Sequence, residues 1–302
     1  MVVRRTSAPR GRACRPGVRR HRDPRRLCDW SARSGPGRRD RRRAPPHSSH
    51  GLQTARAPRT RPPGDLATRE GRHAAAAEAV RRADGRVDAV IACAGLSLPK
   101  TATARVNYFG MTEFLEAMQP TLVRAEAPRA ALISSMASLQ PVADPLVDAL
   151  LSGDEDASVA IAGELESDPQ QGSLIYSSSK RAISRWVRRE APTARWAGAG
   201  IPLNAVGPGT VVTPMTADLL SSKEGTALVD AVVPMPLNYH QSPESIANLL
   251  LWLTSVENSH CCGQTIYCDG GADVVLRGDD TWSWNEDSIR ETFAKIYAGL
   301  SG

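Results

Sequence analysis

A tyrosine and a lysine stand four positions apart in the segment YSSSK, as Tyr176 and Lys180. On a helix this spacing brings both side chains to one face. A free phenol has a pKa of about 10, too high for efficient proton transfer near neutral pH, and an adjacent ammonium group would lower that pKa. The pair could therefore act as a catalytic couple in proton transfer. Taken alone the signal is weak, because a simple helix-face contact explains the same spacing.

These side chains need a scaffold, and the sequence after residue 63 predicts one. Segments with helical apolar spacing alternate there with short apolar segments. We expect helices within 68–84, 103–125, 145–168, 176–198 and 242–255, and strands within 87–95, 130–135, 201–209 and 263–271. This alternation predicts an α/β fold with a parallel sheet that is covered on both faces. Ligands bind to such sheets at the carboxyl ends of the strands.

The motifs follow these elements in a fixed order. CAGL ends the strand at 87–95, VNYFG lies on the next helix, ISSMAS ends the following strand, and YSSSK and NAVGPGTVVTP come after it. This series resembles the short-chain dehydrogenase/reductase family from about residue 64 to 271. CAGL, VNYFG and the long spacing between serine and tyrosine look most like its 3α-hydroxysteroid dehydrogenase/carbonyl reductase branch. The resemblance implies a Rossmann-like doubly wound parallel sheet and an NAD(P)-dependent oxidoreductase that interconverts an alcohol and a carbonyl.

The resemblance also implies roles for four residues, namely Asn107, Ser135, Tyr176 and Lys180. Tyr176 would be the acid, and Ser135 would hydrogen-bond the substrate oxygen in preference to the other two serines of ISSMAS. Lys180 would bind the nicotinamide ribose hydroxyls. Asn107 would hold a water that relays protons to Lys180, although an amide in a helix interior that bonds a neighbouring strand would also explain it.

A dinucleotide site is implied by the same resemblance, with NAD favoured over NADP. Asp65 and Leu66 would meet the adenine ring, although a plain helix cap would explain Asp65 equally well. Gly95 would let the backbone approach the dinucleotide closely. The implied cofactor-binding residues are Asp65, Leu66, Ala94, Gly95, Tyr176, Lys180, Pro208, Gly209, Val211 and Thr213.

The start of the chain departs from the family. The family opens with a strand and a TGxxxGxG loop whose backbone amides reach the pyrophosphate, and neither occurs here. The segment RSGPGRRD at 33–40 follows no apolar strand and contains Pro36, so we reject it as a phosphate loop. The first strands of the sheet are then absent or replaced by an irregular segment, which makes strand 87–95 an edge. We therefore expect the chain to bind dinucleotide poorly or not at all.

Residues 1–63 also differ in composition from the rest. Through residue 62 they carry 19 arginines and three aspartates without lysine or glutamate, which gives this part a net charge of +16 and the remainder −10. We expect this segment to be disordered or to be a frame-shifted translation of a GC-rich gene. The alternative is a non-enzymatic protein whose basic arm binds nucleic acid. That arm has Trp30 as its aromatic residue and no lysine, which disfavours the alternative.

The core should span 64–278, with an insertion at about 139–172 and a helical tail at 279–302. The acidic insertion would cap the fold or alter the dimer surface, and a solvated helix pair is favoured there over a substrate lid. Apolar residues between 215 and 240 would form either helix core or a pocket for a steroid, terpenoid or aromatic carbonyl compound. They are Met215, Leu219, Leu220, Val229, Val232, Val233, Met235 and Leu237. By resemblance the intact protein would be a homodimer or a homotetramer.

Other classes of protein are disfavoured. No apolar run reaches the ~18 residues that a membrane span needs. The six cysteines show no metal-binding spacing, so we expect no metal, and a reduced, cytoplasmic setting fits. Cys93 and Cys268 lie in apolar runs and are predicted to be buried thiols.

Overall fold

The structure, a computed structural model, describes residues 2–4, 64–283, 287, 290–291 and 293–295, and all of them belong to one structural unit. Almost all of the arginine-rich segment lies outside these residues. The hypotheses of disorder, of a frame shift and of a nucleic-acid-binding arm at 1–63 therefore stay predictions.

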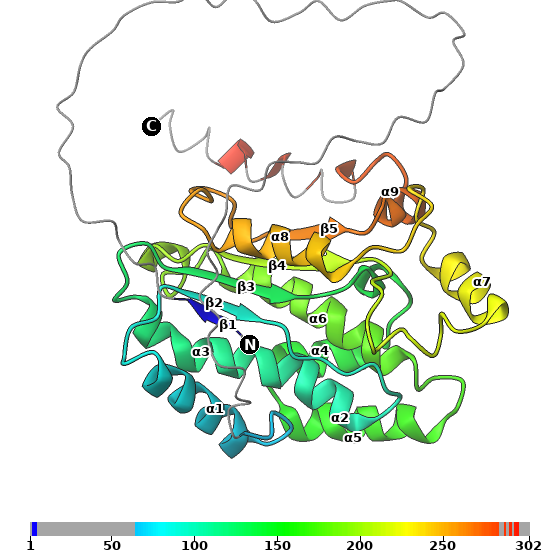
Figure 1. Ribbon diagram of the computed structural model, residues 1–302, viewed down its shortest axis with the longest axis horizontal. Coiled ribbons are helices and arrows are strands. Elements are labelled where there is room, and N and C mark those ends of the chain that lie inside the picture. Colours follow the sequence, from blue (N-terminus) through cyan, green and yellow to red (C-terminus); the bar gives the residue numbers. More distant parts are fainter. Residues whose placement is uncertain (1, 5–63, 284–286, 288–289, 292, 296–302) are drawn as a thin grey trace, which may run out of the picture. The chain divides into compact units, whose positions relative to one another are not determined.

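A five-stranded sheet forms the centre of this unit (Figure 1). Its strands lie in chain order: β1 Val2–Arg4, β2 Ala89–Ala92, β3 Arg129–Ile133, β4 Leu203–Pro208 and β5 Thr265–Cys268. Strands β2 to β5 are parallel, with Ala92 beside Leu132 and Val206 beside Ile266. Almost every residue of β2, β3 and β4 is buried, as expected of parallel strands that are covered on both faces. The predicted α/β parallel sheet is confirmed.

The prediction that strand 87–95 forms an exposed edge is wrong. Strand β1 pairs antiparallel with β2 and sets Val3 opposite Val90. An unpaired edge presents backbone donors and acceptors that can template another strand, and Val2–Val3 is the β-branched pair of the arginine-rich segment that favours a strand. That segment is thus not wholly irregular, and the sheet is mixed rather than purely parallel.

Helices cover both faces of the sheet (Figure 1). They are α1 Arg69–Arg82, α2 Thr101–Ala104, α3 Gly110–Leu122, α4 Asp144–Ser152, α5 Glu155–Ser167, α6 Leu174–Glu190, α7 Lys223–Val232, α8 Pro243–Leu253 and α9 Ala272–Arg277. On one face, α3 and α6 bury Phe114 and Val187 against Leu132 in the larger core, and α1 packs on α3. On the other face, α8 buries Ile246 and Leu250 in a smaller core.

Two predicted helices differ in their bounds. The helix expected at 103–125 is divided into α2, a π-helix at Arg105–Phe109, and α3. Helix α6 ends at Glu190 rather than near residue 198. Pro192 explains this end, because proline has no backbone N–H with which to continue the helical hydrogen bonds.

The insertion forms the expected helix pair. Gly153, in the left-handed conformation with φ of 79°, ends α4, and α5 starts two residues later. The pair is less solvated than predicted, since Leu146 and Leu150 of α4 and Leu165 of α5 are buried. These side chains join the larger core, so the insertion packs on the fold.

The cysteine prediction is wrong. Cys93 lies one residue beyond the end of β2 and has an exposed side chain, and Cys268 on the outer strand β5 is half-buried. In the predicted tail at 279–302, the described residues 287, 290–291 and 293–295 are helical.

Candidate active site

Tyr176 and Lys180 lie one turn apart on α6, as their spacing predicts. The ammonium nitrogen of Lys180 is 5.7 Å from the centre of the Tyr176 ring. It also donates a 3.1 Å hydrogen bond to the carbonyl oxygen of Ile133, the last residue of β3. The candidate pair therefore meets the carboxyl edge of the sheet, where parallel sheets bind ligands.

Ser135 follows β3 and is half-buried. Its hydroxyl oxygen accepts a 3.1 Å hydrogen bond from the backbone nitrogen of Ala137 and so caps the short 3₁₀ helix Met136–Leu139. A hydroxyl that accepts in this way keeps its own proton available for donation. The Ser135 side chain acts to lower the pKa of Tyr176, which agrees with a position of Ser135 on the Tyr176 side of the site.

The other two serines of ISSMAS have different partners. The Ser134 hydroxyl is buried, donates to the carbonyl oxygen of Lys180 at 3.0 Å and lies 2.8 Å from the Ser184 hydroxyl. The Ser138 hydroxyl is buried 2.8 Å from the hydroxyl of Tyr267. Among the three serines, the geometry thus favours Ser135 as the one that hydrogen-bonds a substrate oxygen.

Burial dominates the electrostatics of the pair. It raises the pKa of Tyr176 above its ordinary value, and the hydrogen bond from Ser135 offsets this only in part. Burial likewise lowers the pKa of Lys180 to about 8. The expectation that Lys180 lowers the pKa of Tyr176 is not met in this arrangement, because burial of the phenol has the largest effect and raises that pKa.

Asn107 lies in the π-helix between α2 and α3 and is completely buried. Its amide nitrogen donates to the carbonyl oxygen of Leu96 at 3.0 Å and to the hydroxyl of Ser179 at 3.1 Å. Its amide oxygen accepts from the backbone nitrogen of Leu96 at 2.8 Å. Asn107 therefore ties the loop after β2 to α6 rather than to a neighbouring strand, and its part in a proton relay stays a prediction. π-Bulges occur frequently at functional sites.

The loop after β2 passes close to Lys180. A Cβ atom added at Gly95 would lie 3.6 Å from the ammonium nitrogen of Lys180 and 3.5 Å from the amide oxygen of Asn107. Within the described part of the chain, the ammonium group donates one hydrogen bond, to Ile133. Its other N–H donors suit the hydroxyl groups of a ribose. Gly95 is thus brought next to Lys180. Ala94 and Gly95 are both half-buried, and their role in cofactor binding stays a prediction.

The segment after β4 borders the same site. Gly207 of β4 is close to Ser135, since a Cβ added there would lie 3.5 Å from the Ser135 carbonyl carbon. The half-buried Pro208 and Gly209 follow directly. Further on, Val211 pairs with Gln241, and the backbone nitrogen of Thr213 donates to the Thr216 hydroxyl at 3.0 Å. This ordered turn fits the nicotinamide-side segment that the resemblance implies.

Asp65 and Leu66 belong to a different network. The N-cap of α1 is Thr68, whose hydroxyl accepts a hydrogen bond from the backbone nitrogen of Gly71. The alternative that Asp65 serves as the helix cap is therefore wrong. Asp65 instead accepts from the backbone nitrogen of Ala67 at 2.9 Å and closes a turn before the helix. The Leu66 carbonyl oxygen accepts from Arg72. This turn lies at the start of α1 rather than among the residues around Lys180.

Two residues that the sequence analysis missed hold the Ser135 loop. Arg181 donates from its Nε to the carbonyl oxygen of Ser138, and the hydroxyl of Tyr267 bonds the Ser138 side chain. The Tyr267 ring also occupies the space beside Gly207. The sequence offered one signal, an arginine directly after Lys180, and none for Tyr267, whose partner is 129 positions away.

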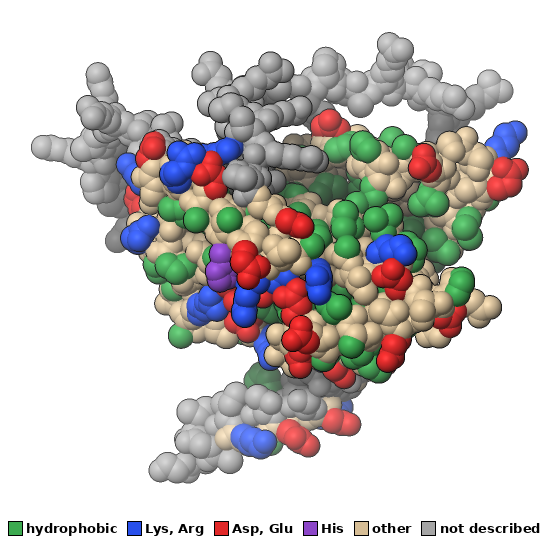
Figure 2. All heavy atoms as spheres, turned by 90° about the horizontal axis from the view of Figure 1, so that it is seen from below, with side chains coloured by type: hydrophobic (Ala, Val, Ile, Leu, Met, Phe, Trp, Pro, Cys, Tyr) green, Lys and Arg blue, Asp and Glu red, His purple; other side chains and the backbone are tan. Residues whose placement is uncertain are grey.

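Other kinds of site find no support in the described residues. Within them no group of histidine, cysteine and carboxylate side chains could hold a metal ion, and no helix is long and apolar enough to cross a bilayer. The face shown in Figure 2 carries acidic and basic side chains side by side rather than a field of one sign.

Known proteins resemble this chain over most of its length. A family model described as Enoyl-(Acyl carrier protein) reductase matches residues 52–273, a range that starts inside the arginine-rich segment. The 3-alpha-hydroxysteroid dehydrogenase/carbonyl reductase of Comamonas testosteroni is 37% identical over 223 residues, which cover 70% of this chain and 83% of that protein.

Solved structures of known proteins also resemble this chain. The 3-alpha-hydroxysteroid dehydrogenase of Pseudomonas sp. B-0831, complexed with NADH, is 31% identical with a TM-score of 0.65 and covers 72% of this chain and 85% of its own. A 7 alpha-hydroxysteroid dehydrogenase complexed with NADH and a bile acid is 21% identical with a TM-score of 0.51 over 69% of this chain and 72% of its own, which shows a shared fold.

Proposed function

Because this chain belongs to the short-chain dehydrogenase/reductase family, we propose that it is an NAD(P)-dependent oxidoreductase that interconverts an alcohol and a carbonyl compound. The observation that carries the proposal is the grouping of Ser135, Tyr176 and Lys180 at the carboxyl edge of the sheet. The relatives and their NADH complex favour NAD as the cofactor.

In this proposal Ser135 and Tyr176 act on the substrate oxygen. The Ser135 hydroxyl, fixed by its bond to Ala137, donates to the carbonyl oxygen and orients it. Tyr176 delivers its proton to that oxygen as negative charge develops there. The raised pKa keeps the phenol protonated before the reaction, which suits the direction of carbonyl reduction.

Lys180 serves the cofactor side of the site. When bound, a reduced nicotinamide supplies the hydride. The ammonium group of Lys180, next to Gly95, would hold the ribose hydroxyls. Asn107 holds the loop that carries Gly95 and so keeps Gly95 beside Lys180.

An apolar substrate fits the segment that follows β4. Helix α7 has no buried residue, so the alternative that its apolar side chains form helix core is wrong. Met215 and Leu219 are about half exposed, at 49% and 50%. We propose that this segment covers a steroid, terpenoid or aromatic carbonyl compound.

Exposed Trp252 on α8 supports a homo-oligomer, and the free cysteines among the described residues suit a reducing, cytoplasmic setting.

The test is turnover of the full chain with NADH and NADPH against a panel of 3-oxo steroids, terpenoid ketones and aromatic aldehydes. Tyr176→Phe should remove nearly all turnover while cofactor binding stays largely intact. Tyr239→Phe is the control, because it loses the same hydroxyl from an exposed ring. If Tyr176→Phe keeps more than about a tenth of the rate, a loss under about 1.4 kcal/mol, Tyr176 is not the acid.

A further inference from the structure

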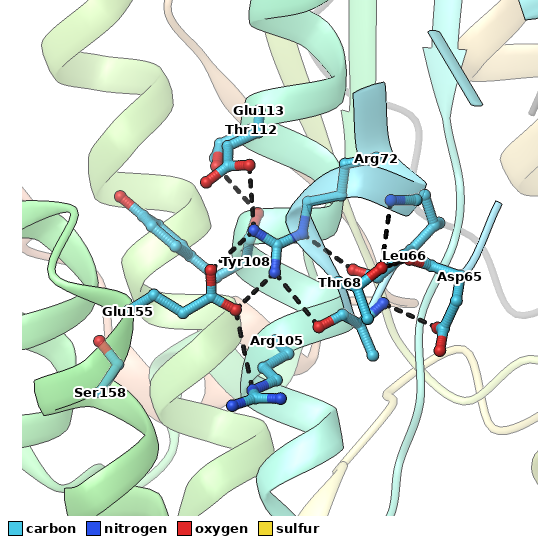
Figure 3. A network of polar contacts seen from close by, with 12 residues as sticks. Asp65, Leu66, Thr68, Arg72, Arg105, Tyr108, Thr112, Glu113, Glu155 and Ser158 are labelled. Carbon is cyan, nitrogen blue, oxygen red and sulfur yellow. Dashed lines mark hydrogen bonds and ion pairs between the residues drawn. The ribbon is translucent and has the colours of Figure 1, made fainter. Parts of the chain in front are cut away.

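Arg72 of α1 is a completely buried arginine that joins separate parts of the fold (Figure 3). Its Nε donates to the carbonyl oxygen of Leu66 at 3.0 Å, and one terminal nitrogen donates to the carbonyl oxygen of Ala67 at 3.4 Å. Arg72 therefore binds the backbone of the turn that precedes its own helix.

The other contacts of Arg72 reach the insertion and α3. Both carboxylate oxygens of Glu155, the first residue of α5, accept from the guanidinium group at 2.9 and 2.5 Å. Glu113 of α3 lies 3.0 Å from it, and Arg105 lies 3.7 Å from Glu155. Burial acts against the charge of Arg72, but the bonds to Glu155 and Glu113 outweigh it and raise its pKa.

Close packing on neighbouring helices also restricts the conformation of the Asp65–Leu66 turn, in addition to its contact with Arg72. A Cβ added at Gly71 would lie 2.0 Å from the Asp65 carbonyl oxygen, and one added at Gly110 would lie 3.2 Å from the Leu66 Cβ. The turn therefore sits directly on α1 and α3, and Arg72 fixes the direction of its carbonyl groups. A guanidinium group suits this task because its donors form a rigid, planar array that can serve carboxylates and carbonyls together.

We propose that Arg72 is a positioning residue for the adenine half of the dinucleotide, and that the insertion sets the geometry of the Asp65–Leu66 turn through Glu155. This inference rests on the proposed function and on the contact between that turn and adenine that the family resemblance implies. It assigns to the insertion a part in cofactor binding, in addition to the packing of α4 and α5 on the fold. The competing explanation is that the contact between Arg72 and Glu155 contributes only to the global stability of the fold.

The decisive variant is Glu155→Gln, which keeps the shape of the side chain and removes its charge. Its matched control is Glu166→Gln, also on α5, since Glu166 binds Lys100 and the backbone nitrogen of Thr101 instead of Arg72. Two properties of the full chain are measured in each variant. They are hydrogen exchange of the backbone amides at 65–71, and the affinities for NADH and for reduced nicotinamide mononucleotide, which lacks the adenylate.

We expect Glu155→Gln to speed exchange at 65–71 and to weaken NADH binding about tenfold, roughly 1.4 kcal/mol, while binding of the mononucleotide stays unchanged. Glu166→Gln should leave the exchange at 65–71 and the affinities for NADH and the mononucleotide near their wild-type values. Glu155→Asp, which keeps the charge, replaces the variant if Glu155→Gln does not fold.

Unchanged exchange at 65–71, or equal weakening of both ligands, overturns the proposal, because a global loss of stability does not distinguish the two halves of the cofactor. If the wild-type chain binds neither ligand at millimolar concentration, the proposed function fails, and the exchange measurement alone decides whether the insertion holds the turn.

Discussion

Replacing Lys180 by methionine should stabilise the fold near neutral pH while it impairs the proposed activity. The Lys180 side chain is 2% exposed, and burial lowers its pKa from 10.5 to about 8. An unfolded chain would hold this proton at the ordinary pKa. Lys180→Met keeps the length and apolar stem of the side chain and removes the charge.

The magnitude follows from the shift in pKa. Between the two pKa values the folded state binds fewer protons than the unfolded state, so stability rises with pH across this window. Below a pH of about 8 the full cost of the buried charge is present, about 3 kcal/mol at 1.36 kcal/mol for each pKa unit. Methionine also loses the hydrogen bond to Ile133, which contributes about 1 kcal/mol. The net gain is about 2 kcal/mol.

The assay is urea unfolding of the wild type and of Lys180→Met at several pH values from about 7 to about 10.5, the window set by the two pKa values. The variant should be the more stable protein at the low end, and its advantage should disappear at the high end. Lys100→Met is the control, because Lys100 is exposed and pairs with Glu166, so it should show no such dependence. A variant that is less stable than wild type at neutral pH, with a difference that does not change with pH, would refute the reasoning.

Three further predictions concern the site and the start of the chain. Asn107→Ala removes three hydrogen bonds and leaves buried partners at Leu96 and Ser179, so denaturant unfolding should show a loss of about 2–4 kcal/mol; a loss under about 1 kcal/mol contradicts the tie between the β2 loop and α6. The chain should bind NADH and NADPH poorly, because its described residues hold no glycine-rich phosphate loop; micromolar affinity in a fluorescence titration would be the contrary result. The DNA upstream of codon 64, translated in another forward frame, should encode an apolar strand followed by TGxxxGxG; if neither frame does, the arginine-rich segment is a genuine part of the protein.

Much of the fold was predictable because its signals are local. Strands β2, β3 and β4 are mostly apolar segments, α1 is rich in helix-forming alanine, and the apolar spacing of α6 and α8 has a helical period, so chain order and burial follow from the sequence. The end of α6 was misjudged because Pro192 was not weighed against the apolar spacing around it. Pairing of the short strand β1 with β2 depends on an edge that becomes available only once the sheet has formed.

The candidate site was predictable to the extent that motifs carry it. The motif order identified Ser135, Tyr176 and Lys180, and the structure brings them together. The contact between Ser138 and Tyr267, which holds the Ser135 loop, could not be foreseen because the two residues are 129 positions apart. The contact between Arg72 and Glu155, at the separate Asp65–Leu66 turn, spans 83 positions. The direction of the pKa shift of Tyr176 was also misjudged. Burial dominates this shift, and burial follows from tertiary packing rather than from a local motif.

Isotope transfer tests the central claim most directly, namely that this site moves a hydride to a carbonyl carbon with Tyr176 as the proton donor. The full chain is incubated with millimolar dinucleotide that carries deuterium at the reacting nicotinamide carbon, together with a 3-oxo steroid, and the alcohol is examined by mass spectrometry. The account predicts deuterium on the carbinol carbon with the wild type and background label with Tyr176→Phe. Unlabelled alcohol from the wild type, or equal labelling in both proteins, would contradict it.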